Sequence, residues 1–361
     1  MTILLYSIIE IVSLYMIYIG EKKNKHLKKL SYFNVWLILT ALIALRDVSV
    51  GQDYQNYYYA IIRVAEGQMR SYDSSWLSPG FRAIIRLFSH MGIPATAIVM
   101  IITFIFAAGT IYFFLRAIRE FSIEPVLSLF ILYSFCYVFQ AMNQFRQMFA
   151  VALVLYSFRY IDKSLWRYVL IIVIASLLHS SALIMLPMYW IVKLDINKKL
   201  VFIYFIMAIA VIFLWPMARK LIEYTPYAYY LGWKQYDVAA TNTSILNLIV
   251  RTIMVMFTLV FYKKVIAFNP RNNILYHMVI ICTVLQVLSI YINLFARITT
   301  YFYVFYILLI PEVMPFVKKC FTYNSKKYIS TAIWCAFLAY QIVYFHVQSQ
   351  ESCYAIYKTI F

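Results

Sequence analysis

Charged residues, glycine and clustered cysteines are all scarce in this chain, and each scarcity excludes a class of protein. Only 13% of the 361 residues are charged, whereas 64% are hydrophobic, against about 45–50% apolar residues in soluble domains. A water-soluble protein is therefore excluded. The five cysteines include no Cys-x-x-Cys pair, so no disulfide framework or zinc site is expected. Because Gly/Ser linkers are also absent, we expect one transmembrane domain over residues 1–361.

Acidic residues are rarer than basic ones, with 14 Asp and Glu against 32 Lys and Arg. No Asp-x-Asp pair offers the oxygen ligands that a hard divalent cation prefers. We therefore expect a metal-independent site without a cofactor. The net charge of +18 is scattered between apolar stretches instead of gathered on a basic arm, which argues against nucleic-acid binding.

Long apolar stretches are what the chain has in abundance. A membrane-spanning helix needs about 20 apolar residues, and fewer where a helix is short or broken. Isolated spans must satisfy their own backbone hydrogen bonds, so the predicted fold is an all-α polytopic membrane protein. We expect about twelve spans, of which the sixth and seventh could instead be one long helix broken at His179: 2–19, 32–45, 93–115, 125–141, 147–161, 167–178, 181–193, 199–216, 245–263, 273–292, 298–317 and 329–347.

Lysine and arginine gather in every second connection, which predicts the orientation of the chain. With the first connection in the cytoplasm, both termini face outward, together with two long loops at about 46–92 and 217–244. These two loops are where we expect an active site. The basic residues on the cytoplasmic side are then Lys22, Lys23, Lys25, Lys28, Lys29, Arg116, Arg119, Lys163, Arg167, Lys193, Lys198, Lys199, Lys263, Lys264, Arg271, Lys318, Lys319, Lys326 and Lys327.

The cations left on the outer side are mostly arginines. A planar guanidinium suits bidentate binding of phosphate, whereas lysine alone would serve topology. We interpret the group as the binding site of a phosphate-bearing ligand, although any single arginine could instead contact a lipid headgroup or a neighbouring acid. The group comprises Arg46, Arg63, Arg70, Arg82, Arg86, Arg146, Arg219, Arg251 and Arg297.

The first outer loop opens with a cation, a glycine, a carboxylate and two rings: Arg46, Gly51, Asp53, Tyr54 and Tyr57. The glycine permits a tight turn that could bring Asp53 back toward Arg46. The pair is then either an interfacial ion pair or a site in which Arg46 holds a phosphate and Asp53 accepts a proton from a sugar hydroxyl.

A second constellation is Asn143, Arg146 and Gln147, at the outer start of the fifth predicted span. Asn143 is a favourable N-cap residue, and a helix starting there would point its free amides and positive dipole end outward. This arrangement predicts an anion site, with a snorkelling interfacial arginine as the alternative. Arg297 repeats the theme at the outer end of the eleventh span.

His179 interrupts an apolar run from Tyr168 to Val192. An ionisable residue at such a break is a candidate base or pyrophosphate ligand, although it could also pack two half-helices together. In the second outer loop, Trp233 and several tyrosines either stack on sugar faces or form an interfacial aromatic belt.

These residues resemble the EpsG/Wzy-type family of polysaccharide polymerases. The resemblance covers roughly residues 40–312 and rests on Arg46 with Gly51, Asp53, Tyr54 and Tyr57; on Asn143, Arg146, Gln147 and Ala150; on His179-Ser180-Ser181-Ala182; and on Arg297 with Tyr301 and Phe302. One departure is Ser78, in Leu77-Ser78-Pro79-Gly80-Phe81, where the family often has glutamate.

The resemblance implies a C-type glycosyltransferase in the bacterial inner membrane with an extracytoplasmic active site. Its substrate would be a polyprenyl-pyrophosphate-linked oligosaccharide, whose repeat units it would join into a surface polysaccharide. Arg146, Arg297 and Arg46, with Asn143 and Gln147, would bind pyrophosphate; Tyr54, Tyr57 and Trp233 would contact sugar. Either His179 or Asp53 would be the base.

The same resemblance suggests a chain-length regulator and a flippase as pathway partners, in addition to membrane lipids. Two other functions remain open. The many spans and the internal arginines would also suit a lipid-linked oligosaccharide flippase. The sequence shows no internal repeat of the kind that is common in transporters. An O-antigen ligase would use the same donor with another acceptor.

Overall fold

The computed structural model describes residues 2–70, 73, 76–224, 242–291, 294–352 and 354–360. Apart from one isolated antiparallel bridge between Arg46 and Thr359, the secondary structure of these residues is helical, which confirms the all-α prediction for them. Trp233 and most of the second predicted outer loop lie outside the described residues.

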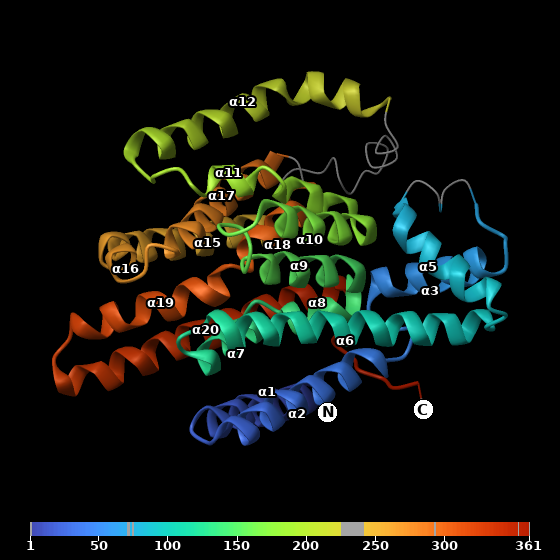
Figure 1. Cartoon of the computed structure of the whole chain (residues 1–361), viewed down its shortest axis with the longest axis horizontal. Coiled ribbons are helices and arrows are strands. Elements are labelled where there is room, and N and C mark those ends of the chain that lie inside the picture. The colour runs from blue at the N-terminus through green and yellow to red at the C-terminus, as the bar shows by residue number, and fades with distance from the viewer. Residues whose placement is uncertain are drawn as a thin grey trace.

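The helices follow one another with short connections (Figure 1). They are α1 (Thr2–Glu21), α2 (Lys25–Ala44), α3 (Gln52–Ala65), α5 (Pro79–His90), α6 (Ala95–Phe121), α7 (Pro125–Ser134), α8 (Tyr137–Asn143), α9 (Phe145–Ser157), α10 (Leu165–Leu178), the 3₁₀ helix η1 (Ser180–Met185), α11 (Met188–Ile191), α12 (Lys198–Ile222), α15 (Asn242–Val260), α16 (Tyr262–Phe268), α17 (Asn272–Tyr291), α18 (Leu294–Tyr303), α19 (Tyr306–Lys319) and α20 (Tyr323–Ser352).

Long apolar helices account for half of the twelve predicted spans. Six described helices are long and apolar enough to cross a membrane, or up to nine if each of three bent pairs counts as one span. The three remaining predictions, 147–161, 167–178 and 181–193, correspond to the short helices α9, α10 and η1 with α11. The count of twelve is therefore not confirmed, because these apolar stretches are divided among short helices.

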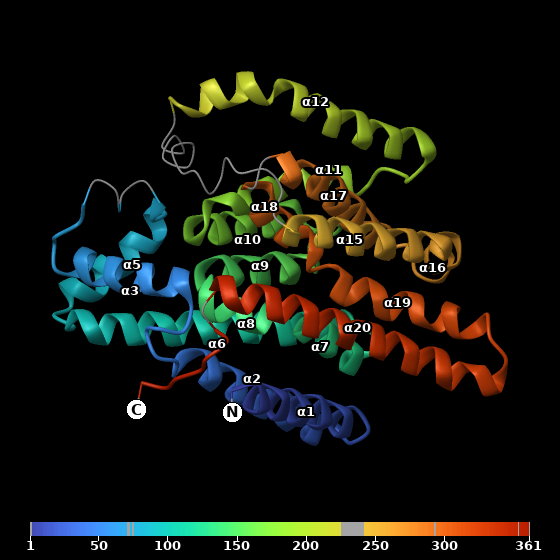
Figure 2. The ribbon, with the colours of Figure 1, turned by 180° about the vertical axis from the view of Figure 1, so that it is seen from behind.

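Lysine-rich connections and the helices of the first outer loop lie at opposite ends of the bundle. The α1–α2 turn, the α19–α20 turn and α16 gather at one end, whereas α3, α5 and the start of α6 lie at the other (Figure 1). From behind, α20 lies across α7, which it contacts (Figure 2). The lysine-rich connections therefore share the end that lies away from the helices of the first outer loop, and which end faces the cytoplasm stays a prediction.

The described part of residues 46–92 includes two amphipathic helices, α3 and α5, instead of a simple loop. In α3 the buried side chains recur every three or four residues, at Tyr54, Tyr57, Ile61 and Val64, so that one face of the helix packs on the bundle. Arg63 at the end of α3 pairs with buried Asp73 through an Nη2–Oδ1 contact of 2.7 Å. This hydrogen bond to the charged form lowers the pKa of Asp73 below its usual value.

Two helices break where polar side chains are needed inside the bundle. α10 ends at Leu178, and His179 has an extended backbone (φ −147°, ψ 104°) before η1 begins. The predicted break at His179 is confirmed. A second break lies between α18 and α19, whose axes are bent by 47°.

Gly51, the N-cap residue of α3, offers a test of how α3 is attached. Its φ is +104°, and a Cβ there would lie 2.7 Å from the Met142 carbonyl oxygen, whereas Gly67 (φ +73°) has open space around it. We expect Gly67→Ala to lower the free energy of unfolding by about 1–2 kcal/mol through the positive φ alone. Gly51→Ala should cost roughly 1–3 kcal/mol more, because the backbone of α8 must also move.

Thermal unfolding of the purified variants in one detergent measures both costs. If both variants lose the same free energy of unfolding, α3 does not pack closely against α8 at Gly51.

Candidate active site

Arg146, the second residue of α9, is a buried cation surrounded by rings. Only 3% of the residue is exposed. Its guanidinium carbon lies 4.5 Å from the ring centroid of Tyr57, 4.9 Å from that of Phe81 and 5.4 Å from that of Trp76. These rings come from α3, α5 and the segment before α5, so the outer helices fold over the arginine. Their faces attract the cation electrostatically.

The guanidinium of Arg146 has hydrogen-bond capacity to spare. Nη2 donates a long hydrogen bond of 3.4 Å to the Trp76 carbonyl oxygen. Nε and Nη1 are buried and have no hydrogen-bond partner among the described residues. No carboxylate of the described residues forms an ion pair with Arg146. A buried charge without a counterion is costly. The arrangement is therefore suited to an anion that supplies the missing acceptors.

Asn143 has a different role from the predicted one. α8 ends at Asn143 and Gln144 is the N-cap of α9, so the prediction that Asn143 caps α9 is wrong. The Asn143 Oδ1 instead accepts a 2.7 Å hydrogen bond from the backbone N–H of Asp53, in the first turn of α3. Asn143 thus satisfies a free amide at the start of a different helix and places the Asp53 carboxylate beside α8.

Arg297 of α18 faces the same carboxylate. Its Nη2 lies 3.5 Å from the Asp53 Oδ2, and both side chains are partly exposed. Gln147 of α9 donates from Nε2 to the Arg297 backbone carbonyl at 2.8 Å, while its buried Oε1 has no hydrogen-bond partner among the described residues. α18 is therefore joined to α9 next to Arg146.

His179 belongs to a triangle of hydrogen-bonding groups at the α10–η1 break. Its Nδ1 lies 2.7 Å from the Ser181 Oγ and 3.1 Å from the Tyr301 hydroxyl, and Ser181 donates to Tyr301 at 3.2 Å. Within the described part of the chain, no hydrogen bond reaches Nε2. Arg146 and Arg297 lie close enough for their charges to act on the imidazole. Ser78 fixes the break from outside, donating to the Leu178 carbonyl at 2.6 Å.

The structure gathers seven of the predicted site residues. Hydrogen bonds and an ion pair join Asp53, Asn143, Gln147 and Arg297 across α3, α8, α9 and α18. Tyr57 packs against Arg146, the neighbour of Gln147 in α9, and His179 bonds Tyr301 of α18.

Arg46 lies outside this group, together with Tyr54, whose ring it contacts. It is 1% exposed, contacts the Ile43 carbonyl and the Tyr54 ring, and makes a backbone bridge to Thr359. No described contact joins it to Arg146 or Arg297.

The rings of Tyr54 and Tyr57 are buried, with 4% and 5% exposure. Each packs against an arginine, Tyr54 against Arg46 and Tyr57 against Arg146, so neither presents an open face to a sugar. The sugar contacts predicted for them have no support in these positions, and Trp233 lies outside the described residues.

Besides Ser78 and Ser181 at the His179 break, three aromatic side chains at the site were not among the predicted site residues. Tyr301 follows Arg297 by four residues and so shares its helix face, a signal present in the sequence. Trp76 and Phe81 gave no such signal, because only the folding of the outer helices brings them to Arg146. Among the described residues, no three His, Cys, Asp or Glu side chains gather as metal ligands.

The model of the EpsG family matches residues 29–359, a stretch that contains every side chain of this site. The chain belongs to the EpsG family. Searches of curated proteins and of solved structures gave no match. Membership of the EpsG family suggests a polysaccharide polymerase of glycosyltransferase type, and the apolar helices make the chain a multi-pass membrane protein.

If the role of Arg146 is to bind a ligand, its buried charge should lower the stability of the ligand-free protein. Arg146→Met removes an unpaired buried charge, so we expect stability to stay equal or rise by about 1–4 kcal/mol. Arg63→Met is the matched control, because it leaves buried Asp73 without its partner and should lower stability by about 3–5 kcal/mol.

Thermal unfolding of the ligand-free variants decides the sign of each change. A marked loss of stability for Arg146→Met would show that the guanidinium supports the fold.

Proposed function

We propose that this EpsG-family protein joins polyprenyl-pyrophosphate-linked oligosaccharide repeat units into a surface polysaccharide at the outer face of the bacterial inner membrane. It would act as a metal-independent glycosyltransferase. The observation that carries the proposal is buried Arg146, whose Nε and Nη1 lack acceptors within the described residues and which lies near His179. A pyrophosphate group would supply both the acceptors and the missing negative charge.

The leaving group sets the main electrostatic demand of this reaction. When the bond between the anomeric carbon and the pyrophosphate oxygen breaks, negative charge develops on the departing polyprenyl pyrophosphate. Arg146 offers N–H groups on Nε and Nη1, and either of them forms a bidentate fork together with Nη2, whose present hydrogen bond to Trp76 is long; Arg297 adds a second cation on the neighbouring helix. Preorganised charges in a site closed to water stabilise such a transition state strongly.

The geometry favours His179 over Asp53 as the base. The Asp53 carboxylate already faces Arg297, and the backbone N–H of Asp53 is bonded to Asn143, so its contacts suit a positioning role. His179 has Nδ1 held by two hydroxyl groups and Nε2 without a described partner. Nε2 would take the proton of the acceptor sugar hydroxyl as its oxygen attacks the anomeric carbon. Asp53 would then orient Arg297.

Two substitutions separate these roles. We expect His179→Ala to reduce the polymerisation rate by about 10²–10⁴-fold, the usual contribution of a general base. Asp53→Asn should cost clearly less, because Arg297 keeps a hydrogen-bond acceptor there. Rates are measured on purified lipid-linked repeats with membranes that contain equal amounts of each variant. A larger loss for Asp53→Asn would transfer the base role to Asp53.

The proposed reaction is tested in cells by deleting the gene and restoring it as variants. An impermeant reagent that labels sugars only on the outer leaflet reports where single repeats accumulate. We expect the deletion strain to accumulate them outside and to lack polymer. Accumulation inside would indicate a flippase, and polymer that forms but is not attached to its acceptor would indicate a ligase.

Variants of Arg146 connect that phenotype to the site. Arg146→Ala should abolish polymer, and Arg146→Lys should restore little of it, because an ammonium cannot make the bidentate contact. Arg86→Ala is the control, since Arg86 is an exposed arginine of α5 at the same end of the bundle. Normal polymer length with Arg146→Ala at normal protein levels would refute the assignment.

A further inference from the structure

A second buried arginine, Arg251, lies on the far side of α18 from the candidate active site. It is a residue of α15 with 4% exposure. Its Nη1 donates to the Gln286 Oε1 of α17 and, at 2.8 Å, to the Thr299 Oγ of α18. Its guanidinium carbon lies 4.2 Å from the ring centroid of Tyr303. One side chain therefore joins three helices.

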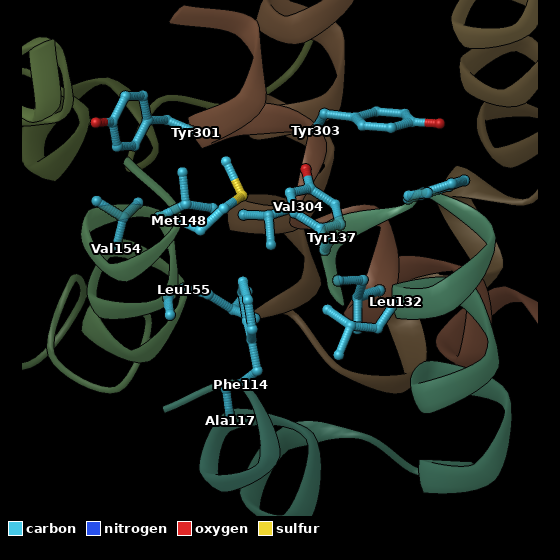
Figure 3. Close-up of a cluster of buried hydrophobic side chains, with 14 of the residues drawn as sticks. Phe114, Ala117, Leu132, Tyr137, Met148, Val154, Leu155, Tyr301, Tyr303 and Val304 are labelled. Carbon is cyan, nitrogen blue, oxygen red and sulfur yellow. The ribbon is translucent and has the colours of Figure 1, made fainter. Parts of the chain in front are cut away.

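α18 has two faces with different neighbours. Arg297 and Tyr301, four residues apart, share the face that meets Asp53 and His179. Thr299 and Tyr303 share the opposite face, which meets Arg251. Figure 3 shows Tyr301 and Tyr303 pointing away from each other. A rotation of α18 would thus move both active-site side chains at once.

The first half of α18 is held by hydrogen bonds from two sides, in addition to its packing on α17. The helix has 10 residues and is bent away from α19. The Thr299 hydroxyl that accepts from Arg251 donates its own proton to the Ala296 carbonyl at 2.8 Å, next to Arg297. On the other side Gln147 donates to the Arg297 carbonyl. Arg251 and Gln147 therefore clamp the same turn from opposite faces.

Burying the guanidinium of Arg251 costs free energy that a purely structural contact would not require. No carboxylate pairs with Arg251 among the described residues, and its Nε is buried without a partner. A neutral side chain would avoid that cost. Departures of this kind are expected where function constrains a residue. Both hydrogen bonds come from Nη1, whose two N–H groups reach Gln286 and Thr299 together while the guanidinium lies over the Tyr303 ring.

We propose that Arg251 is a positioning residue, which holds α18 so that Arg297 faces Asp53 and Tyr301 reaches His179. It contacts no substrate itself and acts through Thr299. The inference rests on the proposed function, because it assigns Arg251 to the same reaction.

The substitution that tests this role is Arg251→Met, which removes the charge but keeps the volume. We expect membrane insertion and thermal stability to be retained, while the polymerisation rate falls about 10- to 100-fold, as for misplaced reacting groups. Thr299→Val should share the loss and Thr299→Ser, which keeps the hydroxyl, should restore it. Thr258→Val is the control, because that buried hydroxyl bonds only the carbonyl of Val255 in its own helix. Equal rates for Thr299→Val and Thr299→Ser would overturn the proposal.

A double-mutant cycle with Arg297→Gln separates positioning from a general structural effect. If Arg251 acts through α18, Arg251→Met should cost clearly less in the Arg297→Gln background than in the wild type, because the part of its effect that passes through Arg297 is already lost, while the part that passes through Tyr301 remains. If the rate loss of the double variant equals the product of the two single losses, the proposal is overturned. Full activity of Arg297→Gln alone would instead refute the proposed site, and so marks failure of the proposed function.

Discussion

A guanidinium held away from water without a carboxylate is the constraint on which the site depends. Arg146 is nearly fully buried, yet its nearest described neighbours are rings and one carbonyl oxygen. Such a charge is tolerated only where other contacts hold the surrounding helices. α3 and α5 provide Tyr57 and Phe81, and α3 is itself attached to α8 through the hydrogen bond between Asp53 and Asn143. The contacts that attach the outer helices to the bundle therefore also form the surroundings of the candidate anion site.

Short and broken helices bring polar groups together inside an apolar bundle. α9 begins at the site with Arg146, α10 ends at it with His179, and α18 presents Arg297 and Tyr301 before bending into α19. Unwound backbone at membrane depth is acceptable only beside protein or a polar cavity. Ser78 satisfies a carbonyl at the His179 break in this way. The same breaks allow five separate segments to contribute side chains to one place.

Hydropathy predicted the long helices and the break at His179 well, because both depend on local composition. It did not settle whether α9, α10 and η1 with α11 cross the membrane, because these apolar helices are short. Outward arginines and the histidine were recognised as chemical candidates from residue type and position. What each touches was not predictable: Asn143 caps α3 instead of α9, and the Tyr57 ring covers Arg146. These contacts join segments distant in sequence, so only tertiary packing determines them.

The claim that Arg146 holds pyrophosphate is tested most directly by binding. The purified protein in lipid nanodiscs is titrated with a polyprenyl pyrophosphate and with the matching polyprenyl alcohol, beside Arg146→Met and Arg86→Ala. The account predicts that the wild type and Arg86→Ala prefer the pyrophosphate at least about tenfold, a difference of about 1.4 kcal/mol, and that Arg146→Met loses this preference. An unchanged preference in Arg146→Met would contradict it.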